Sequence, residues 1–205
     1  MNIKIVKDGN NMMNTNSYLV YDKESKDSYI IDAPTKTQKF IDIIEEEELN
    51  LKYVLLTHAH FDHIEEIDFW REKYDVKIVA HELSKTYLEN PEYNLSTLSN
   101  NIISNYADIY LSGDTGQFEI FKYIRTPGHS FDGITYILGN LLFVGDLIFK
   151  ESIGRNDFIG SNYEDQVHSI KEIIYKFNDD CIILPGHGAN TTVEHEKKYN
   201  PFIPY

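Results

Sequence analysis

Apolar residues recur with two spacings along the chain. The first, in which several apolar residues follow one another in a short run, predicts β-strands. Short runs rich in Val, Ile, Leu, Tyr and Phe are bounded by Asp, Asn, Gly and Lys, which favour turns. The continuous apolar run at residues 53–56 is typical of a buried strand, and Gly139-Asn140 predicts a hairpin turn. We predict strands at residues 3–6, 17–21, 29–31, 53–56, 77–80, 118–124, 134–138, 141–144 and 181–184.

The second spacing places apolar residues three and four positions apart and predicts amphipathic helices. Phe40, Ile41 and Ile44 follow it, and the acidic run at residues 45–48 is interpreted as the solvated face of that helix. Helices are predicted at residues 35–49, 64–73, 81–88, 163–177 and 192–199, and a long loop at 90–113. Strands interleaved with helices predict a layered α/β (α+β) architecture. Because no low-complexity linker interrupts the chain, we expect a single domain over residues 1–205.

The composition limits which partners the chain can have. With 205 residues, 41% of them hydrophobic and 13% aromatic, the chain can bury one sizeable core. The formal net charge is −14, and the 19 Lys and Arg residues are scattered, so a nucleic-acid partner is not expected.

Two further features bear on the cellular location of the protein. The single cysteine, Cys181, lies in an apolar run; it rules out an intrachain disulfide and fits a reducing compartment. The N-terminal segment is too short and polar for a secretory signal. No run approaches the roughly 18 apolar residues of a membrane span. We therefore expect a soluble, cytoplasmic protein with no membrane partner.

A histidine-rich segment follows the apolar run at 53–56 and carries the first candidate chemistry. It reads Thr57-His58-Ala59-His60-Phe61-Asp62-His63. In an extended backbone alternate residues share one face, so His58, His60 and Asp62 are expected to point the same way. His63 is expected to point elsewhere, where the chain turns into the next helix. So many imidazoles beside a buried strand need hydrogen-bond partners or a metal.

Three more candidate ligands lie directly after predicted strands. His129, Asp146 and His187 each follow a glycine, which lets the backbone turn sharply. If four strand ends meet at one edge of a sheet, all seven side chains come together.

The same segments resemble the motifs of the metallo-β-lactamase superfamily, and most closely those of the small glyoxalase II-like hydrolases. Further similar segments are Ile31-Asp32-Ala33, residues 152–158 and Asn200-Pro201-Phe202. The resemblance implies a four-layer αββα sandwich. The motifs that carry it are His58-Ala59-His60-Phe61-Asp62-His63, Thr126-Pro127-Gly128-His129, Gly145-Asp146 and Pro185-Gly186-His187-Gly188.

The resemblance also implies a binuclear metal site. One ion would be held by His58, His60 and His129, the other by Asp62, His63 and His187, with Asp146 bridging them. Asp32 would hydrogen-bond the ligand shell, although it also fits a turn residue that ends a strand. Arg155 would bind an anionic part of the substrate, although it also fits a surface salt bridge. The remaining histidines, His81, His168 and His195, are interpreted as ordinary surface or helix residues.

The ligand set predicts the chemistry. Imidazoles and carboxylates without a thiolate suit two divalent ions, most simply zinc, with iron or manganese as alternatives. Two such ions lower the pKa of a bridging water to roughly 7. The resulting hydroxide would cleave a thioester, as in a hydroxyacylglutathione hydrolase, or a related ester, with Asp62 or Asp146 relaying protons. The expected partner is thus a small-molecule thioester or ester.

The chain departs from the family pattern at several positions. Ile64-Glu65-Glu66 stands where relatives usually have glycines, and Ala189 stands where a proline is common. Asp146, rather than cysteine, separates the chain from many true β-lactamases of the fold. The chain ends soon after its last motif, without the helical domain that holds glutathione in glyoxalase II, so whether the substrate contains glutathione stays open.

Two other functions remain as alternatives. One is a persulfide dioxygenase, which uses the same scaffold with one iron held by two histidines and an aspartate and shares the Gly154-Arg155 neighbourhood. The other is a non-enzymatic metal-binding module. The metal motif also allows a nuclease, which the charge and the short length disfavour. The substrate, the native metal and the oligomeric state are not determined by the sequence.

Overall fold

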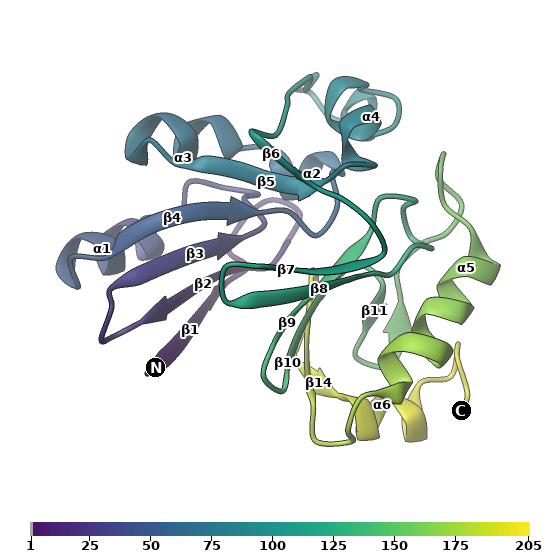
Figure 1. The fold of residues 1–205 in the computed structure, drawn as a ribbon. Helices are drawn as coiled ribbons and strands as arrows, with labels where there is room; N and C mark the ends of the chain where they lie inside the picture. The colour runs from purple at the N-terminus through teal and green to yellow at the C-terminus, as the bar shows by residue number, and fades with distance from the viewer. Residues whose placement is uncertain (1) are drawn as a thin grey trace. The chain divides into compact units, whose positions relative to one another are not determined.

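The structure is a computed structural model that describes residues 2–205, and these residues form two compact units (Figure 1). The first unit holds the described residues up to 80 together with residues 85–110, and the second holds residues 81–84 and 111–205. Each unit is built around a six-stranded sheet. That the two units make up a single domain stays a prediction.

The first sheet has the strand order β1-β2-β3-β4-β5-β6. The pairs β1/β2 and β2/β3 are antiparallel, whereas β3/β4 and β4/β5 are parallel. A parallel pair needs a crossover connection, and α1 connects β3 to β4 while α2 and α3 connect β4 to β5. The strands are β1 (Ile3–Asp8), β2 (Ser17–Asp22), β3 (Asp27–Ile31), β4 (Asn50–Leu55), β5 (Lys77–His81) and β6 (Ile109–Leu111). The helices are α1 (Gln38–Glu46), α2 (Phe61–Ile64), α3 (Ile67–Tyr74), α4 (Ser84–Glu89) and the 3-10 turn η1 (Ser96–Leu98).

One face of this sheet packs against its crossover helices. Leu19, Ile30 and Val54, from β2, β3 and β4, share a buried cluster with Phe40 of α1 and Trp70 of α3. The helical spacing seen in the sequence therefore marks the residues that bury this face.

The second sheet has the order β14-β13-β10-β9-β8-β7. In this sheet β10 and β13 pair in parallel, and the other neighbouring strands pair antiparallel. The strands are β7 (Thr115–Phe118), β8 (Phe121–Arg125), β9 (Ile134–Leu138), β10 (Leu141–Gly145), β13 (Ile182–Pro185) and β14 (Thr191–Thr192), and a separate hairpin is formed by β11 (Ile148–Phe149) and β12 (Ser152–Ile153). The helices are α5 (Tyr163–His168), continued by a π-helical turn (Ser169–Ile173) and a 3-10 turn (Ile174–Lys176), and α6 (Val193–Tyr199).

The predicted elements agree with this architecture, with a few corrections. The single strand expected at 118–124 is a hairpin, because Glu119 adopts a left-handed backbone conformation between β7 and β8. The helix expected at 64–73 starts anew at Ile67, and the loop expected at 90–113 contains β6 and a helical turn. Two main sheets flanked by helices confirm the mixed α/β class. Among residues 2–205, no helix is both long and apolar enough to cross a membrane.

Candidate metal centre

Four of the predicted ligands lie just beyond the end of β4, in the first unit. The loop after Leu55 carries His58 and His60, and α2 begins at Phe61, so that Asp62 and His63 lie in the first turn of a short helix. The expectation that an extended backbone aligns Asp62 with His58 and His60 is wrong for this reason. All three imidazoles are buried.

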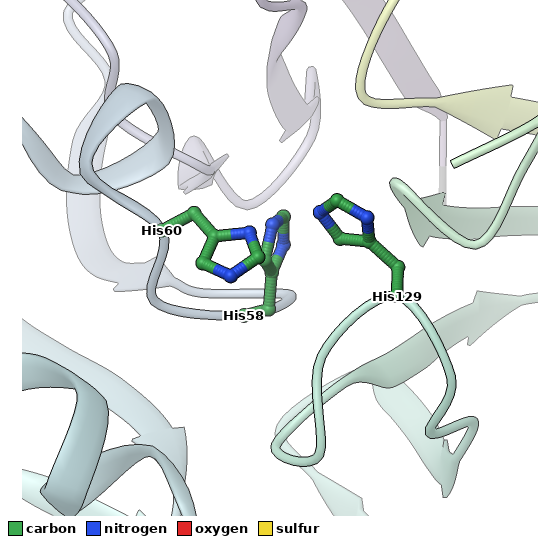
Figure 2. Close-up of side chains that lie close together, drawn as sticks. All are labelled: His58, His60 and His129. Carbon is green, nitrogen blue, oxygen red and sulfur yellow. The ribbon is translucent and has the colours of Figure 1, made fainter. Parts of the chain in front are cut away.

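The side chains of this segment nevertheless lie close together. The ring centroid of His58 is 4.7 Å from that of His60 and 4.2 Å from that of His63. Nε2 of His63 lies 3.8 Å from Oδ2 of Asp62. Figure 2 shows the rings of His58 and His60 on their shared loop, and His129 on the loop that follows β8.

Asp32, directly after β3, orients two of these imidazoles. It is buried, and its carboxylate accepts hydrogen bonds from the amide of Thr57 (2.8 Å), the hydroxyl of Thr57 (2.8 Å) and Nδ1 of His63 (2.9 Å). Because a carboxylate has no proton to give, His63 donates from Nδ1 and carries its lone pair on Nε2. The hydroxyl of Thr57 donates its one proton to Asp32, so in the contact with Nδ1 of His58, at 3.2 Å, the hydroxyl oxygen is the acceptor. Nε2 of His58 therefore also carries the lone pair, as a histidine that binds metal through Nε2 would.

The second unit carries the other three predicted ligands. Asp146 follows β10 and His187 follows β13, and because these two strands are parallel their ends lie at the same edge of the sheet. Oδ2 of Asp146 lies 3.3 Å from Nε2 of His187 and 3.7 Å from Nε2 of His129. Nδ1 of His129 donates to the carbonyl of Arg155 at 2.7 Å, which leaves its lone pair on Nε2, facing Asp146.

Close backbone packing around Asp146 depends on two glycines. A Cβ at Gly154 would overlap the carbonyl oxygen of Asp146, and a Cβ at Gly128 would overlap the backbone of Gln166. Gly128 also has φ +148°, a conformation that residues with a side chain rarely adopt. The loop that carries His129 therefore packs against α5, and Gly154 packs against Asp146, more closely than side chains at these positions would permit.

Each unit thus carries its own group of imidazole and carboxylate donors. Imidazole and carboxylate groups without a thiolate fit zinc, iron or manganese. In three of the five imidazoles Nδ1 donates a hydrogen bond to an oxygen atom. This is the usual arrangement around histidines that bind metal through Nε2. The residues present therefore fit divalent metal ions.

The sequence did not indicate Gln166, whose side chain links the loops around Asp146 through hydrogen bonds. It is fully buried in α5; its amide donates to the carbonyls of Leu147 (3.0 Å) and Gly154 (2.9 Å) and accepts from Nδ2 of Asn156 (3.1 Å). A glutamine in an amphipathic helix carries no signal in one sequence that separates it from a solvated position.

We expect Gln166→Leu to lower the free energy of unfolding by about 1–3 kcal/mol, because buried carbonyls lose their donor. Thermal unfolding of the purified protein measures the effect. Gln117→Leu is the matched control, because the Gln117 amide donates to the carbonyl of Glu119 on the surface. Equal melting temperatures for the two variants would contradict the bracing role of Gln166.

Arg155 forms a salt bridge in this structure. Its guanidinium donates to both carboxylate oxygens of Asp157 (3.0 and 2.9 Å) and stacks on the ring of Phe158. These hydrogen bonds raise the pKa of Arg155 and lower the pKa of Asp157. An anionic substrate group would compete with Asp157 for this cation, so the predicted substrate contact stays a prediction.

Two of the three histidines outside the motifs have local structural contacts. The interpretation of His81 as a surface or helix residue is wrong: it is buried at the end of β5, with Nε2 3.1 Å from the carbonyl oxygen of Gly113, and the helix expected to begin at residue 81 starts at Ser84. His195 contacts the carboxylate of Glu151 at 2.8 Å. His168 is the last residue of α5.

Comparison with known proteins identifies the family. Residues 11–187 match the Metallo-beta-lactamase superfamily. A probable metallo-hydrolase of Streptococcus pyogenes is 32% identical over 98% of this chain and 90% of its own length. The hydroxyacylglutathione hydrolase GloC of Haemophilus influenzae is 34% identical over 92% of each chain. The chain therefore belongs to the metallo-β-lactamase superfamily.

Solved structures agree with this assignment. The BLEG-1 B3 metallo-β-lactamase superposes with a TM-score of 0.90 at 31% identity, over 98% of this chain and 99% of the other. TTHA1623 in a di-iron-bound form gives 0.85 at 25% identity over 96% and 99%, and ETHE1 from Myxococcus xanthus gives 0.75 at 25% identity over 99% and 84%. The predicted metallo-β-lactamase fold class is confirmed.

Proposed function

We propose that this chain is a binuclear metal-dependent hydrolase that cleaves a thioester of the hydroxyacylglutathione type or a related ester. The observation that carries the proposal is the donor set, in which the imidazoles of His58, His63 and His129 are each held through Nδ1, so that Nε2 carries the lone pair that would bind an ion. The similarity to GloC over 92% of each chain supports the choice of a thioester. The di-iron form of TTHA1623 supports the count of two ions.

The metal ligands would divide into two groups with one shared carboxylate. His58, His60 and His129 would hold one ion, Asp62, His63 and His187 the other, and Asp146 would bridge. When bound, such ions supply a water of lowered pKa as nucleophile and polarise the acyl carbonyl. Zinc is the first choice for this donor set, and iron and manganese fit it as well.

The chain's own residues would position these groups and move protons. Asp62 is suited to exchange a proton with a reacting oxygen or sulfur, because its carboxylate is 12% exposed and held on one side by the hydroxyl of Thr15. A covalent cysteine route is disfavoured. Cys181 is buried in the core of the second unit, and burial raises the pKa of its thiol. We therefore expect direct attack by water without an acyl-enzyme intermediate.

The proposed partner is a small molecule, because 33 acidic residues against 19 basic ones oppose the binding of a phosphate backbone. A cytoplasmic location stays a prediction from the sequence.

The proposal is tested with a substrate panel: a hydroxyacyl-glutathione thioester, an acyl-coenzyme A thioester, a carboxylic ester and a β-lactam. We expect thioester hydrolysis to exceed the other activities, to vanish when metal is removed by chelation and to return when zinc is added. Hydrolysis of the β-lactam alone, or thioester hydrolysis that survives chelation, would contradict it.

The alternative is a persulfide dioxygenase with a single iron, which the similarity to ETHE1 keeps possible. Oxygen uptake with a glutathione persulfide separates the two functions. We expect no uptake above the rate of the metal-free protein, whereas uptake that depends on iron would favour the dioxygenase.

A further inference from the structure

Thr15 lies two residues before the first residue of β2 and contacts a residue of the candidate metal centre. Its side chain is fully buried, and its hydroxyl donates a hydrogen bond of 2.9 Å to Oδ2 of Asp62, 47 positions along the chain. The same carboxylate oxygen lies 3.8 Å from Nε2 of His63. The hydroxyl of Thr15 therefore restrains the carboxylate that lies beside this imidazole.

The backbone of Thr15 is itself held in place by Asn11. Oδ1 of Asn11 accepts from the amide of Thr15 at 3.0 Å, and Nδ2 of Asn11 donates to the carbonyl of Thr15 at 2.7 Å. Oδ1 of Asn11 also accepts from the amide of Met13 at 3.2 Å. One amide side chain thus closes the loop at residues 11–15 and fixes the position from which Thr15 reaches Asp62.

A carboxylate on a short helix retains rotational freedom about its terminal torsion, which is broad and nearly two-fold. A buried hydroxyl donor favours one orientation, so less rotational freedom is lost when the group binds an ion. We infer that Thr15 is a positioning residue for Asp62, and that Asn11 acts through Thr15. This inference rests on the proposed function, in which Asp62 is a ligand of the second ion.

The protein offers a matched control within the first unit. The hydroxyl of Thr37 also donates to a carboxylate, that of Asp8, and Thr37 is buried as well. Neither Thr37 nor Asp8 belongs to the candidate ligand set. Thr37→Val therefore removes the same kind of hydrogen bond without touching Asp62.

The experiment is a titration of the metal-free full chain with zinc alone, by calorimetry, on wild type, Thr15→Val, Thr15→Ala, Thr15→Ser, Asn11→Ala and Thr37→Val. Outer partners of metal ligands typically contribute about 10–100-fold to affinity. In Thr15→Val and Thr15→Ala we expect the affinity for one of two zinc equivalents to fall about 10-fold or more, while the other equivalent binds as in wild type. Thr15→Ser should retain both, because it keeps the hydroxyl, and Asn11→Ala should show a smaller loss in the same equivalent.

The two proposals fail in different ways. If wild type binds two zinc ions, and Thr15→Val and Thr15→Ala bind both as tightly, the positioning role is wrong and the proposed function is untouched. If Thr37→Val loses zinc affinity to the same extent, the effect belongs to general stability and the inference is also wrong. If wild type binds no zinc or other divalent ion, both proposals fail. Melting temperatures of the metal-free variants show whether each one folds, and Thr15→Ala, which adds no bulk, keeps the test valid if Thr15→Val does not.

Discussion

Replacing Asp146 by Ala is expected to abolish hydrolysis and to reduce the affinity for metal by more than about 100-fold, since loss of even an outer partner of a ligand costs about 10–100-fold. Asp146 lies within 3.7 Å of the Nε2 atoms of both His129 and His187, so its loss removes the carboxylate that these imidazoles share. Metal content after dialysis and the rate of thioester hydrolysis measure the two effects.

Asp114→Ala is the control for this variant. Asp114 is an exposed carboxylate of the same unit, paired with Arg125 at 3.1 Å. We expect it to retain wild-type metal content and activity. Full metal content in Asp146→Ala would show that Asp146 is not a ligand, and the assignment of a bridging carboxylate would then be wrong.

The second large effect is expected for Asp32→Asn. Asparagine tolerates the left-handed backbone at this position (φ +57°) and keeps one oxygen acceptor for Thr57. Its NH2 group cannot accept the proton of His63 Nδ1, so the favoured tautomer of His63 carries its proton on Nε2, the proposed ligand atom. We therefore expect a folded protein whose metal affinity falls about 10–100-fold.

Asp22→Asn separates this tautomer effect from the loss of any buried carboxylate. Asp22 is buried in the same unit and accepts hydrogen bonds from the backbone amides of Asn2 and Glu24, which lower its pKa. We expect Asp22→Asn to lower the melting temperature while leaving metal binding intact. If both variants bind metal as wild type does, Asp32 has only a structural role in the turn after β3.

The sequence was most informative where chemistry and periodicity coincide. Histidines and aspartates placed directly after apolar runs indicated which strand ends carry the candidate ligands, and β4, β8, β10 and β13 end close to those residues. Continuous apolar runs identified β10 and β13, whose side chains are largely buried, whereas β8 mixes buried residues with the exposed Lys122. The α/β class follows from the periodicity, whereas the family came from the resemblance of the histidine and aspartate motifs and is shown by the family match over residues 11–187.

What the sequence could not predict depends on contacts between distant residues. Thr15 and Asp62 are 47 positions apart, and nothing in the segment around Thr15 indicates a hydrogen bond to a carboxylate. Gln166 looks like any polar residue of an amphipathic helix, although it is fully buried. The turn at Glu119 was missed because a left-handed conformation there occurs without glycine or asparagine, the residues that usually signal it.

The number of metal ions per chain tests the central claim most directly. Purified protein, first loaded with zinc and then dialysed, is analysed by elemental mass spectrometry, and in parallel the same is done with ferrous iron under anaerobic conditions. We predict two equivalents of metal per chain in at least one of the two preparations, falling below one in Asp146→Ala. A single equivalent of iron that excess metal does not increase, with oxygen uptake on a persulfide, would contradict the binuclear hydrolase and favour the mononuclear dioxygenase.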